Sequence, residues 1–230
     1  GIILLATMTL LPPFMQGLMG YPVIDVGYLL APRGVGTMFA MMLVGRLSGR
    51  VDVRILILLG LLLTSFSMWE MTLFNTDISS WDIVRTGIVQ GLGLGFIFVP
   101  LSTITFATLA PRYRNEGTAL FSLVRNIGSS IGISVVITYL AQRTQMNHEV
   151  FASYITPFNA GLQQGMGTAA LVTPKGLAML NGEVTRQASL LAYLQDFRLM
   201  MWVSLCAIPL VLLLKAPKRG GGKEALAILE

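Results

Sequence analysis

Six ionisable or amide side chains within the long apolar segments of this sequence need a reason, and Glu70 and Arg85 have one as residues at the membrane interface. The other four are Arg33, Gln90, Arg125 and Asn126. A charge at the centre of a bilayer costs roughly 2.5–3.5 kcal/mol on insertion scales, so such residues usually face other helices or a water-filled path. We therefore interpret these four as candidates for the lining of a substrate cavity.

Two of these candidates leave alternatives open. Arg125 lies about nine residues inside its segment, roughly 13 Å from the end at the helical rise, too deep to reach the headgroups easily. It either pairs with backbone carbonyls near Pro100 or contacts substrate or water. Arg33 lies only about four residues inside its segment, so it either extends to the headgroups or faces a central cavity.

The glycines of the fourth apolar segment indicate helix packing. Gly87, Gly91 and Gly95 recur every four residues and so share one helix face, where they permit close approach of another backbone. The run from Gly91 to Gly95 superficially resembles a nucleotide-binding fingerprint, but no strand precedes it. The complete set of predicted packing and hinge residues is Gly87, Gly91, Gly95, Pro100, Gly128 and Gly132.

The sequence contains few residues that could form the active site of an enzyme. It contains one histidine, no Walker-type phosphate loop and no His/Cys cluster that could hold a metal. We therefore predict neither catalysis, nor a metal, nor a cofactor.

The composition predicts an all-α membrane protein. Of 230 residues, 54% are hydrophobic and 12% are charged, whereas charged residues make up about 25% of soluble domains. Apolar runs near the length that a helix needs to cross a bilayer recur along the chain. Although the net charge is +5, the cations are not interleaved along an aromatic face, so nucleic acid is not an expected partner and the lipid bilayer is.

Six membrane spans are predicted, at about 1–20, 28–48, 54–75, 83–109, 117–141 and 190–214. The first five make up residues 1–141. Residues 142–189 are polar and are predicted to form an extended outer loop, with a short amphipathic helix before Phe158 and a helix rising from about Gly182. We interpret this loop either as a solvated connector or as a docking surface for another protein. Residues 215–230 are predicted to form a tail.

The distribution of charge predicts the orientation. The links 46–54 and 110–116 and the tail carry nine of the 16 lysines and arginines, whereas the links 21–27 and 75–82 carry aspartates and no cation. Because cationic loops stay in the cytoplasm, both ends of this segment are predicted to be cytoplasmic. The chain opens on an apolar run without a charged leader, so we expect it to be part of a longer polypeptide.

Three stretches resemble one known family. Residues 89–106 (VQGLGLGFIFVPLSTITF), 122–134 (SLVRNIGSSIGIS) and 27–36 (GYLLAPRGVG) resemble the fourteen-span drug:proton antiporters of the EmrB/QacA type, within the major facilitator superfamily. The resemblance extends over essentially the whole chain and places it in the C-terminal six-helix half of that fold. The cytoplasmic motif of the superfamily is reduced to Gly45, Arg50 and Arg54, with Asp52 where a glycine is expected.

This resemblance implies export of amphipathic, drug-like toxic compounds across a bacterial inner membrane. It implies alternating access between this half and a missing N-terminal half, a proton gradient as the energy source, and proton-coupling carboxylates in that missing half. In Gram-negative relatives it also implies a periplasmic adaptor and an outer-membrane channel as partners. Two alternatives stay open: a non-transporting scaffold or degenerate remnant, and an uptake carrier of the same fold.

Overall fold

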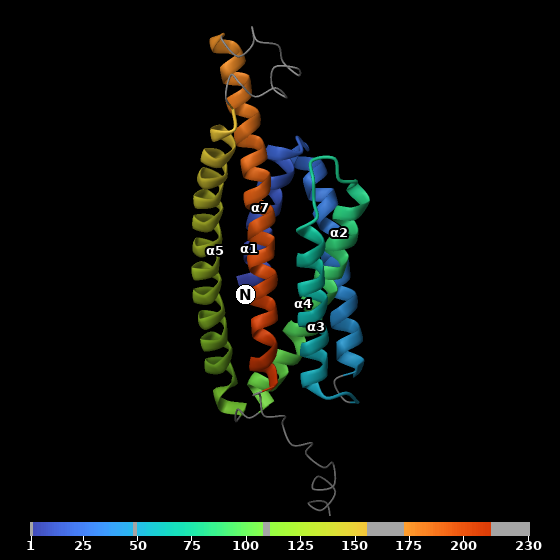
Figure 1. Ribbon diagram of the computed structural model, residues 1–230. Coiled ribbons are helices and arrows are strands. Elements are labelled where there is room, and N and C mark those ends of the chain that lie inside the picture. Colours follow the sequence, from blue (N-terminus) through green and yellow to red (C-terminus); the bar gives the residue numbers. More distant parts are fainter. Residues whose placement is uncertain (1, 48–49, 108–110, 156–172, 213–230) are drawn as a thin grey trace, which may run out of the picture.

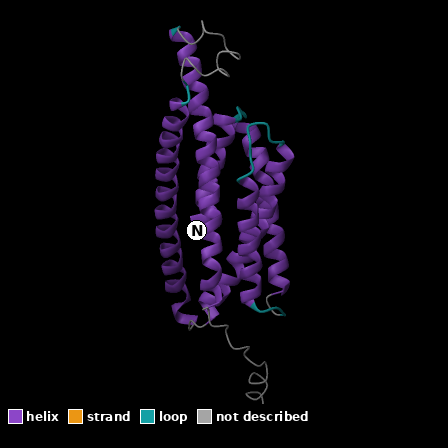
Figure 2. Ribbon diagram, viewed as in Figure 1, coloured by secondary structure: helices purple, strands orange, loops and turns teal. Residues whose placement is uncertain are grey.

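The structure is a computed structural model that describes residues 2–47, 50–107, 111–155 and 173–212. Within these ranges all regular structure is helical, which confirms the predicted all-α class (Figures 1 and 2). Five helices are long and apolar enough to cross a membrane, and a shorter apolar helix precedes them. The elements in chain order are α1 (Ile2–Pro13), a π-helical turn η1 (Phe14–Leu18), α2 (Val23–Leu47), α3 (Val53–Met71), α4 (Ser80–Ala107), a 3-10 turn η2 (Pro111–Tyr113), α5 (Arg114–Ser153) and α7 (Pro174–Leu212).

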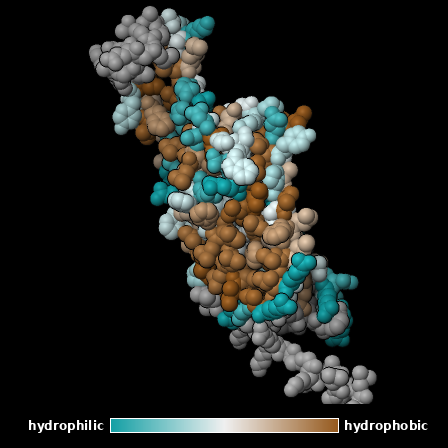
Figure 3. Space-filling view, turned by 90° about the vertical axis from the view of Figure 1, so that its right-hand side faces the viewer, coloured by the Kyte–Doolittle hydropathy of each residue, from teal (hydrophilic) through white to brown (hydrophobic). Residues whose placement is uncertain are grey.

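The helices stand side by side as an elongated bundle. Helices α2, α3 and α4 pack together on one side, and α1, α5 and α7 pack together on the other, with α3 against α7 joining the two groups (Figure 1). A broad band of apolar side chains crosses the surface, and polar side chains gather beyond it (Figure 3). This is the distribution that a protein embedded in lipid requires, because no water hydrates its middle.

The link 142–189 contains more helix than the predicted short helix before Phe158 and the predicted helix from about Gly182, and its outer position stays a prediction. Helix α5 has 40 residues and α7 has 39, which at the helical rise is about 60 Å each, well beyond a hydrocarbon core of about 30 Å. The polar ends of both helices continue past the bundle as an antiparallel pair (Figure 1). Asn147 Nδ2 donates to the Ala188 carbonyl at 3.3 Å, and His148 Nε2 lies 3.0 Å from Asn181 Oδ1.

Polar composition hid the extent of these two helices, because side-chain bonds of Asn147 and His148 connect them in a polar setting. Instead of starting near residue 182, the last helix starts at Pro174, and α5 runs without a break to Ser153. Residues 156–172 and the predicted tail 215–230 lie outside the described residues.

Close backbone contacts at glycines, here called glycine seams, hold helices α2, α3 and α4 together. A side chain at Gly91 would meet the carbonyl oxygen of Arg33, and a Cβ at Gly95 would lie 2.5 Å from the Cβ of Ala40. Gly93 similarly lies against Thr64 of α3. Backbones therefore approach too closely here for any larger residue, as small residues in membrane helices permit.

The other predicted packing glycines differ in how closely neighbouring helices approach them. A Cβ at Gly132 would lie 2.5 Å from Ile2 Cγ2, so this glycine carries the contact of α5 with α1. A Cβ added at Gly87 would lie 3.8 Å from the Cβ of Arg33, which is an ordinary van der Waals distance. A Cβ added at Gly128 would meet no neighbouring element of the described chain within 4 Å, so the packing role of this glycine stays a prediction.

An aromatic cluster joins η1 to two other elements of the bundle. The ring of Phe14 makes edge contacts with Tyr193 at 5.4 Å and Phe197 at 6.0 Å between centroids, and a tilted contact with Phe74 at 6.2 Å. Each such pair contributes about 0.5–1.5 kcal/mol beyond the area it buries. The cluster fixes η1 against the middle of α7 and the segment that follows α3.

Candidate substrate cavity

A cavity of about 520 Å³ opens between four helices of the bundle. Its volume falls within the range of about 300–1,000 Å³ typical of small-molecule sites. Its walls are apolar apart from Thr37 and Arg125. The lining residues are Leu4 of α1, Thr37 and Met41 of α2, Leu94, Ile97, Phe98 and Leu101 of α4, and Phe121, Val124 and Arg125 of α5.

Arg125 supplies the only charge among the described residues of this lining. Its side chain is half-buried, and its guanidinium carbon lies 5.7 Å from the centroid of the Phe98 ring across the α4–α5 interface. Within the described ranges it forms neither an ion pair nor a bond to the carbonyls near Pro100. The guanidinium thus keeps hydrogen-bond donors for a ligand while an aromatic face partly balances its charge.

The backbone around Pro100 satisfies itself locally. Ser102 Oγ donates to the Phe98 carbonyl at 2.9 Å, and Thr103 Oγ1 donates to the Val99 carbonyl at 2.9 Å. Helix α4 continues through the proline to Ala107. The role of Pro100 as a hinge stays a prediction.

Arg33 is turned into the protein and does not extend to the headgroups. The residue is 6% exposed, and its Nη2 donates to Thr7 Oγ1 at 3.0 Å and to the Leu4 carbonyl at 3.4 Å. It therefore ties α2 to α1 one helical turn from Thr37, next to the cavity but outside its lining. A cation held only by neutral oxygens still depends on those bonds, because burial without them would be costly.

The two amide candidates lie elsewhere. Gln90 is fully buried between α4 and α3, where its Nε2 lies 3.9 Å from Met68 Sδ and its Oε1 has no partner among the described residues. It shares a helix face with Thr86, whose carbonyl accepts a bond from Ser67 of α3. Asn126 is exposed on α5. Neither amide is among the lining residues of this cavity, so a cavity role for Gln90 and Asn126 stays a prediction.

The sequence reasoning missed the residues that shape the cavity wall. Phe98, Phe121 and Thr37 stand in segments that are apolar all round, and lipid-facing and cavity-facing positions look alike there. Asp196 was also missed, although it is an acid within the predicted last span; the rarity of acids in membrane helices is a signal that could have found it.

The turn between α2 and α3, predicted to be cytoplasmic, and the helix ends beside it hold the three residues that remain of the expected motif, Gly45, Arg50 and Arg54. Asp52, which replaces the expected glycine, caps α3: its Oδ1 accepts a bond from the Arg54 backbone at 3.0 Å. Arg54 Nε is buried without a hydrogen-bond partner in the described structure, and a Cβ at Gly45 would meet no neighbouring element within 4 Å. Arg50 is exposed at the turn. Asp52 thus stabilises a helix end, which is what an acid does at this position.

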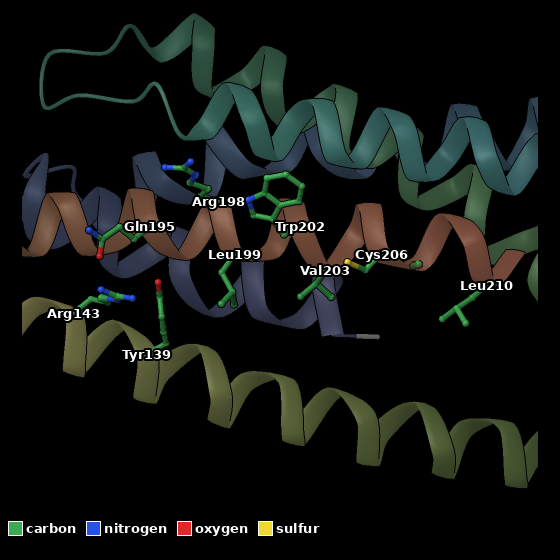
Figure 4. Close-up of a pocket in the computed structure, with 10 residues that line it drawn as sticks. Tyr139, Arg143, Gln195, Arg198, Leu199, Trp202, Val203, Cys206 and Leu210 are labelled. Atoms are coloured by element: carbon green, nitrogen blue, oxygen red, sulfur yellow. The ribbon is translucent and has the colours of Figure 1, made fainter.

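A second hollow of about 820 Å³ runs between α5 and α7 (Figure 4). One end is polar, with Tyr139, Arg143 and Gln195, and the other end is apolar, towards Cys206 and Leu210 (Figure 4).

Beside the α3–α4 loop, Arg85 Nη2 pairs with Glu70 Oε1 at 2.7 Å, as suits a position at the edge of the membrane.

Comparison with known proteins assigns this helical bundle to a family. The profile of the Major Facilitator Superfamily matches residues 1–133. The chain belongs to the major facilitator superfamily. This confirms the family that the three sequence stretches indicated.

Individual relatives of this major facilitator chain are export or resistance proteins by name. The fatty acid resistance protein FarB of Neisseria gonorrhoeae is 29% identical over 96% of the chain and 44% of its own length. The multidrug export protein EmrB of Escherichia coli K12 is 24% identical over 93% of the chain and 42% of its own length. EmrB of Haemophilus influenzae is 25% identical over 69% and 31%. The chain therefore spans less than half the length of these relatives.

Proposed function

We propose that this chain forms the C-terminal half-bundle of a proton-coupled efflux transporter that exports amphipathic compounds from a bacterium by alternating access. The observation that supports this most directly is the cavity between α1, α2, α4 and α5. Its walls are apolar, and its one cation, Arg125, has no ion-pair partner within the described ranges. The relatives named for drug export and fatty acid resistance support the same direction of transport.

The lining favours a particular substrate chemistry. Apolar and aromatic walls accept a hydrophobic body, and a guanidinium with free donors accepts an anionic or polar head. Amphipathic anions, of which fatty acids are one kind, therefore suit the cavity better than cations do. Aromatic cations would have to bind against Phe98 and Phe121 with Arg125 displaced.

The full mechanism needs the other half of the fold. Rocking of two half-bundles about a shared cavity is the usual form of alternating access, and the glycine seams make α2, α3 and α4 a rigid unit that could move as a body. A periplasmic adaptor and an outer-membrane channel are proposed partners. The paired ends of α5 and α7 beyond the apolar band offer them a surface.

Transport assays separate this proposal from its rivals. We would reconstitute the full-length protein that contains this chain in liposomes and impose pH gradients of both signs. Two probes would be used, taurocholate as an amphipathic anion and ethidium as an aromatic cation. Accumulation against the probe gradient in exchange for protons supports efflux; accumulation with protons identifies an uptake carrier; no gradient response identifies a scaffold.

The proposed orientation predicts a labelling pattern. In a Cys206→Ser background, Asp77→Cys in the α3–α4 loop should react with an impermeant maleimide on intact cells. Arg50→Cys in the α2–α3 turn should react only after lysis, since the positively charged turn is proposed to be cytoplasmic. Both positions are exposed, so access to the reagent depends on the side of the membrane. The reverse pattern would overturn the orientation.

A further inference from the structure

Asp196 is a buried acid in the middle of α7 that the cavity does not use. Its exposed fraction is 0%, and neither carboxylate oxygen has a hydrogen-bond partner within the described residues. It belongs to a row of buried positions at four-residue spacing along one face of α7: Ala188, Ala192, Asp196, Met200 and Ser204. This row faces the interior of the bundle, so lipid and a partner chain are both excluded from the carboxyl in this conformation.

The position of Asp196 along the bundle follows from a hydrogen bond of Ser204, about two turns later on α7. Ser204 Oγ donates to the Leu61 carbonyl of α3 at 3.4 Å, and the two helices run in opposite directions (Figure 1). Eight residues along each helix correspond to about 12 Å, so Asp196 lies level with Trp69. Helix α3 ends two residues later, at Met71. The carboxyl is therefore inside the bundle near the end of the apolar band that the proposed orientation places outside.

None of the ionisable side chains around this carboxyl forms a hydrogen bond or an ion pair with it in the described structure. The ionisable side chains at this level on the elements packed against α7, and on α7 itself, are Glu70 of α3, Tyr139 and Arg143 of α5, and Tyr193 and Arg198 of α7. Glu70 is bonded to Arg85, and Arg143 lies over the Tyr139 ring at 4.8 Å. Helix α1 and the turn η1 carry no ionisable side chain.

An ionised carboxylate that has lost water and gained neither donor nor counter-ion is strongly unfavourable, whereas the neutral acid is tolerated. Ionisable groups kept inside a membrane bundle commonly belong to ion or proton pathways. We propose that Asp196 is a proton-binding site of the transport cycle, in addition to any carboxylates in the other half. This inference rests on the proposed proton-coupled function.

The α5–α7 hollow, which reaches the residue before Asp196, is the proposed entry route of the proton. Gln195, the preceding residue, lines the polar end of that hollow beside Arg143 and Tyr139, and its Oε1 is buried without a partner in the described structure (Figure 4). In the forward step the Asp196 carboxylate takes one proton from the outer side and becomes the neutral acid. In the inward-facing conformation the O–H bond breaks, the proton leaves to the cytoplasm, and the carboxylate is restored.

Infrared spectroscopy tests the protonation without any substrate. We would record difference spectra of the full-length protein in lipid nanodiscs between acidic and alkaline buffer. One carbonyl stretching band of a protonated carboxyl should be lost in Asp196→Asn and shifted in Asp196→Glu, and all bands should be unchanged in the matched control Asp77→Asn, whose carboxyl is exposed. An Asp196→Asn spectrum that keeps every wild-type band would overturn the proposal, and if that variant does not fold, an Asp196→Glu spectrum without any shifted band would do so.

Transport then tests whether the site is used. In proteoliposomes, Asp196→Asn should lower taurocholate accumulation driven by the pH gradient at least tenfold but keep exchange of taurocholate across the membrane without a gradient. Asp196→Glu should retain gradient-driven accumulation. Wild-type gradient dependence in Asp196→Asn would overturn the inference. A wild-type protein that ignores the gradient would instead refute the proposed function, while the infrared result still decides whether Asp196 binds a proton.

Discussion

Replacing Arg125 by alanine in the full-length transporter is expected to abolish export of taurocholate and leave the amount of protein in the membrane near normal. The guanidinium is the only charge that lines the cavity and has no ion-pair partner in the described structure, so folding does not depend on a salt bridge there. Losing one charge-assisted contact of about 1.5–3 kcal/mol lowers binding roughly 10- to 150-fold. Initial rates of export from proteoliposomes measure the effect.

Two further variants make the result specific. Arg125→Lys keeps the charge but loses the planar stacking on Phe98, so partial activity is expected. Arg114→Ala removes an exposed arginine at the start of the same helix and should leave export unchanged. If Arg125→Ala instead removes the protein from the membrane, the arginine acts in folding, and the cavity loses its substrate-binding group.

Replacing Gly91 by leucine is expected to prevent assembly of the bundle. A side chain at this position points at the carbonyl of Arg33, with the backbone nitrogen of Thr37 at 3.0 Å from its first carbon. Backbone atoms of a helix cannot move aside as a flexible side chain can, so α2 and α4 must separate. Overpacking typically costs about 1–3 kcal/mol, and here the upper end applies. Membrane abundance and thermal unfolding of the purified protein measure the loss.

Gly87 provides the matched control for that seam. It lies one turn earlier on the same face of α4, and a Cβ added there would lie 3.8 Å from its nearest neighbour, an ordinary van der Waals distance. Gly87→Ala should therefore leave stability unchanged or raise it by up to about 1 kcal/mol through helix propensity. Equal tolerance of Gly91→Leu and Gly87→Ala would show that the α2–α4 seam is looser than described.

The surroundings of each polar side chain explain why these variants act differently. Arg33 and Gln90 are buried at helix interfaces and hold elements together, through a bond to Thr7 and a contact with Met68 respectively. Arg125 faces a hollow and is available to a ligand. A polar side chain in a membrane helix is thus not by itself a transport residue, and its neighbours decide between support and binding.

The sequence alone determined that this chain is helical, membrane-embedded and a member of its superfamily. Apolar length decides that a segment spans a bilayer, because every backbone polar group must be satisfied within the helix. Glycines at four-residue spacing indicated a close seam, and Gly91 and Gly95 form it. The same reasoning missed that α5 continues without a break to Ser153 and that α7 begins at Pro174, eight residues before the predicted start near Gly182.

The tertiary structure alone decided which way each polar side chain points. Lipid and protein interior are equally apolar, so a membrane helix carries no periodic signal that separates the two faces. Arg125 at the cavity, Gln90 at a helix interface and Asn126 at the surface are therefore alike in the sequence. Packing of α4 against α2 and α3 and the position of each side chain relative to the cavity separate them, and packing around α7 is also what deprives Asp196 of water.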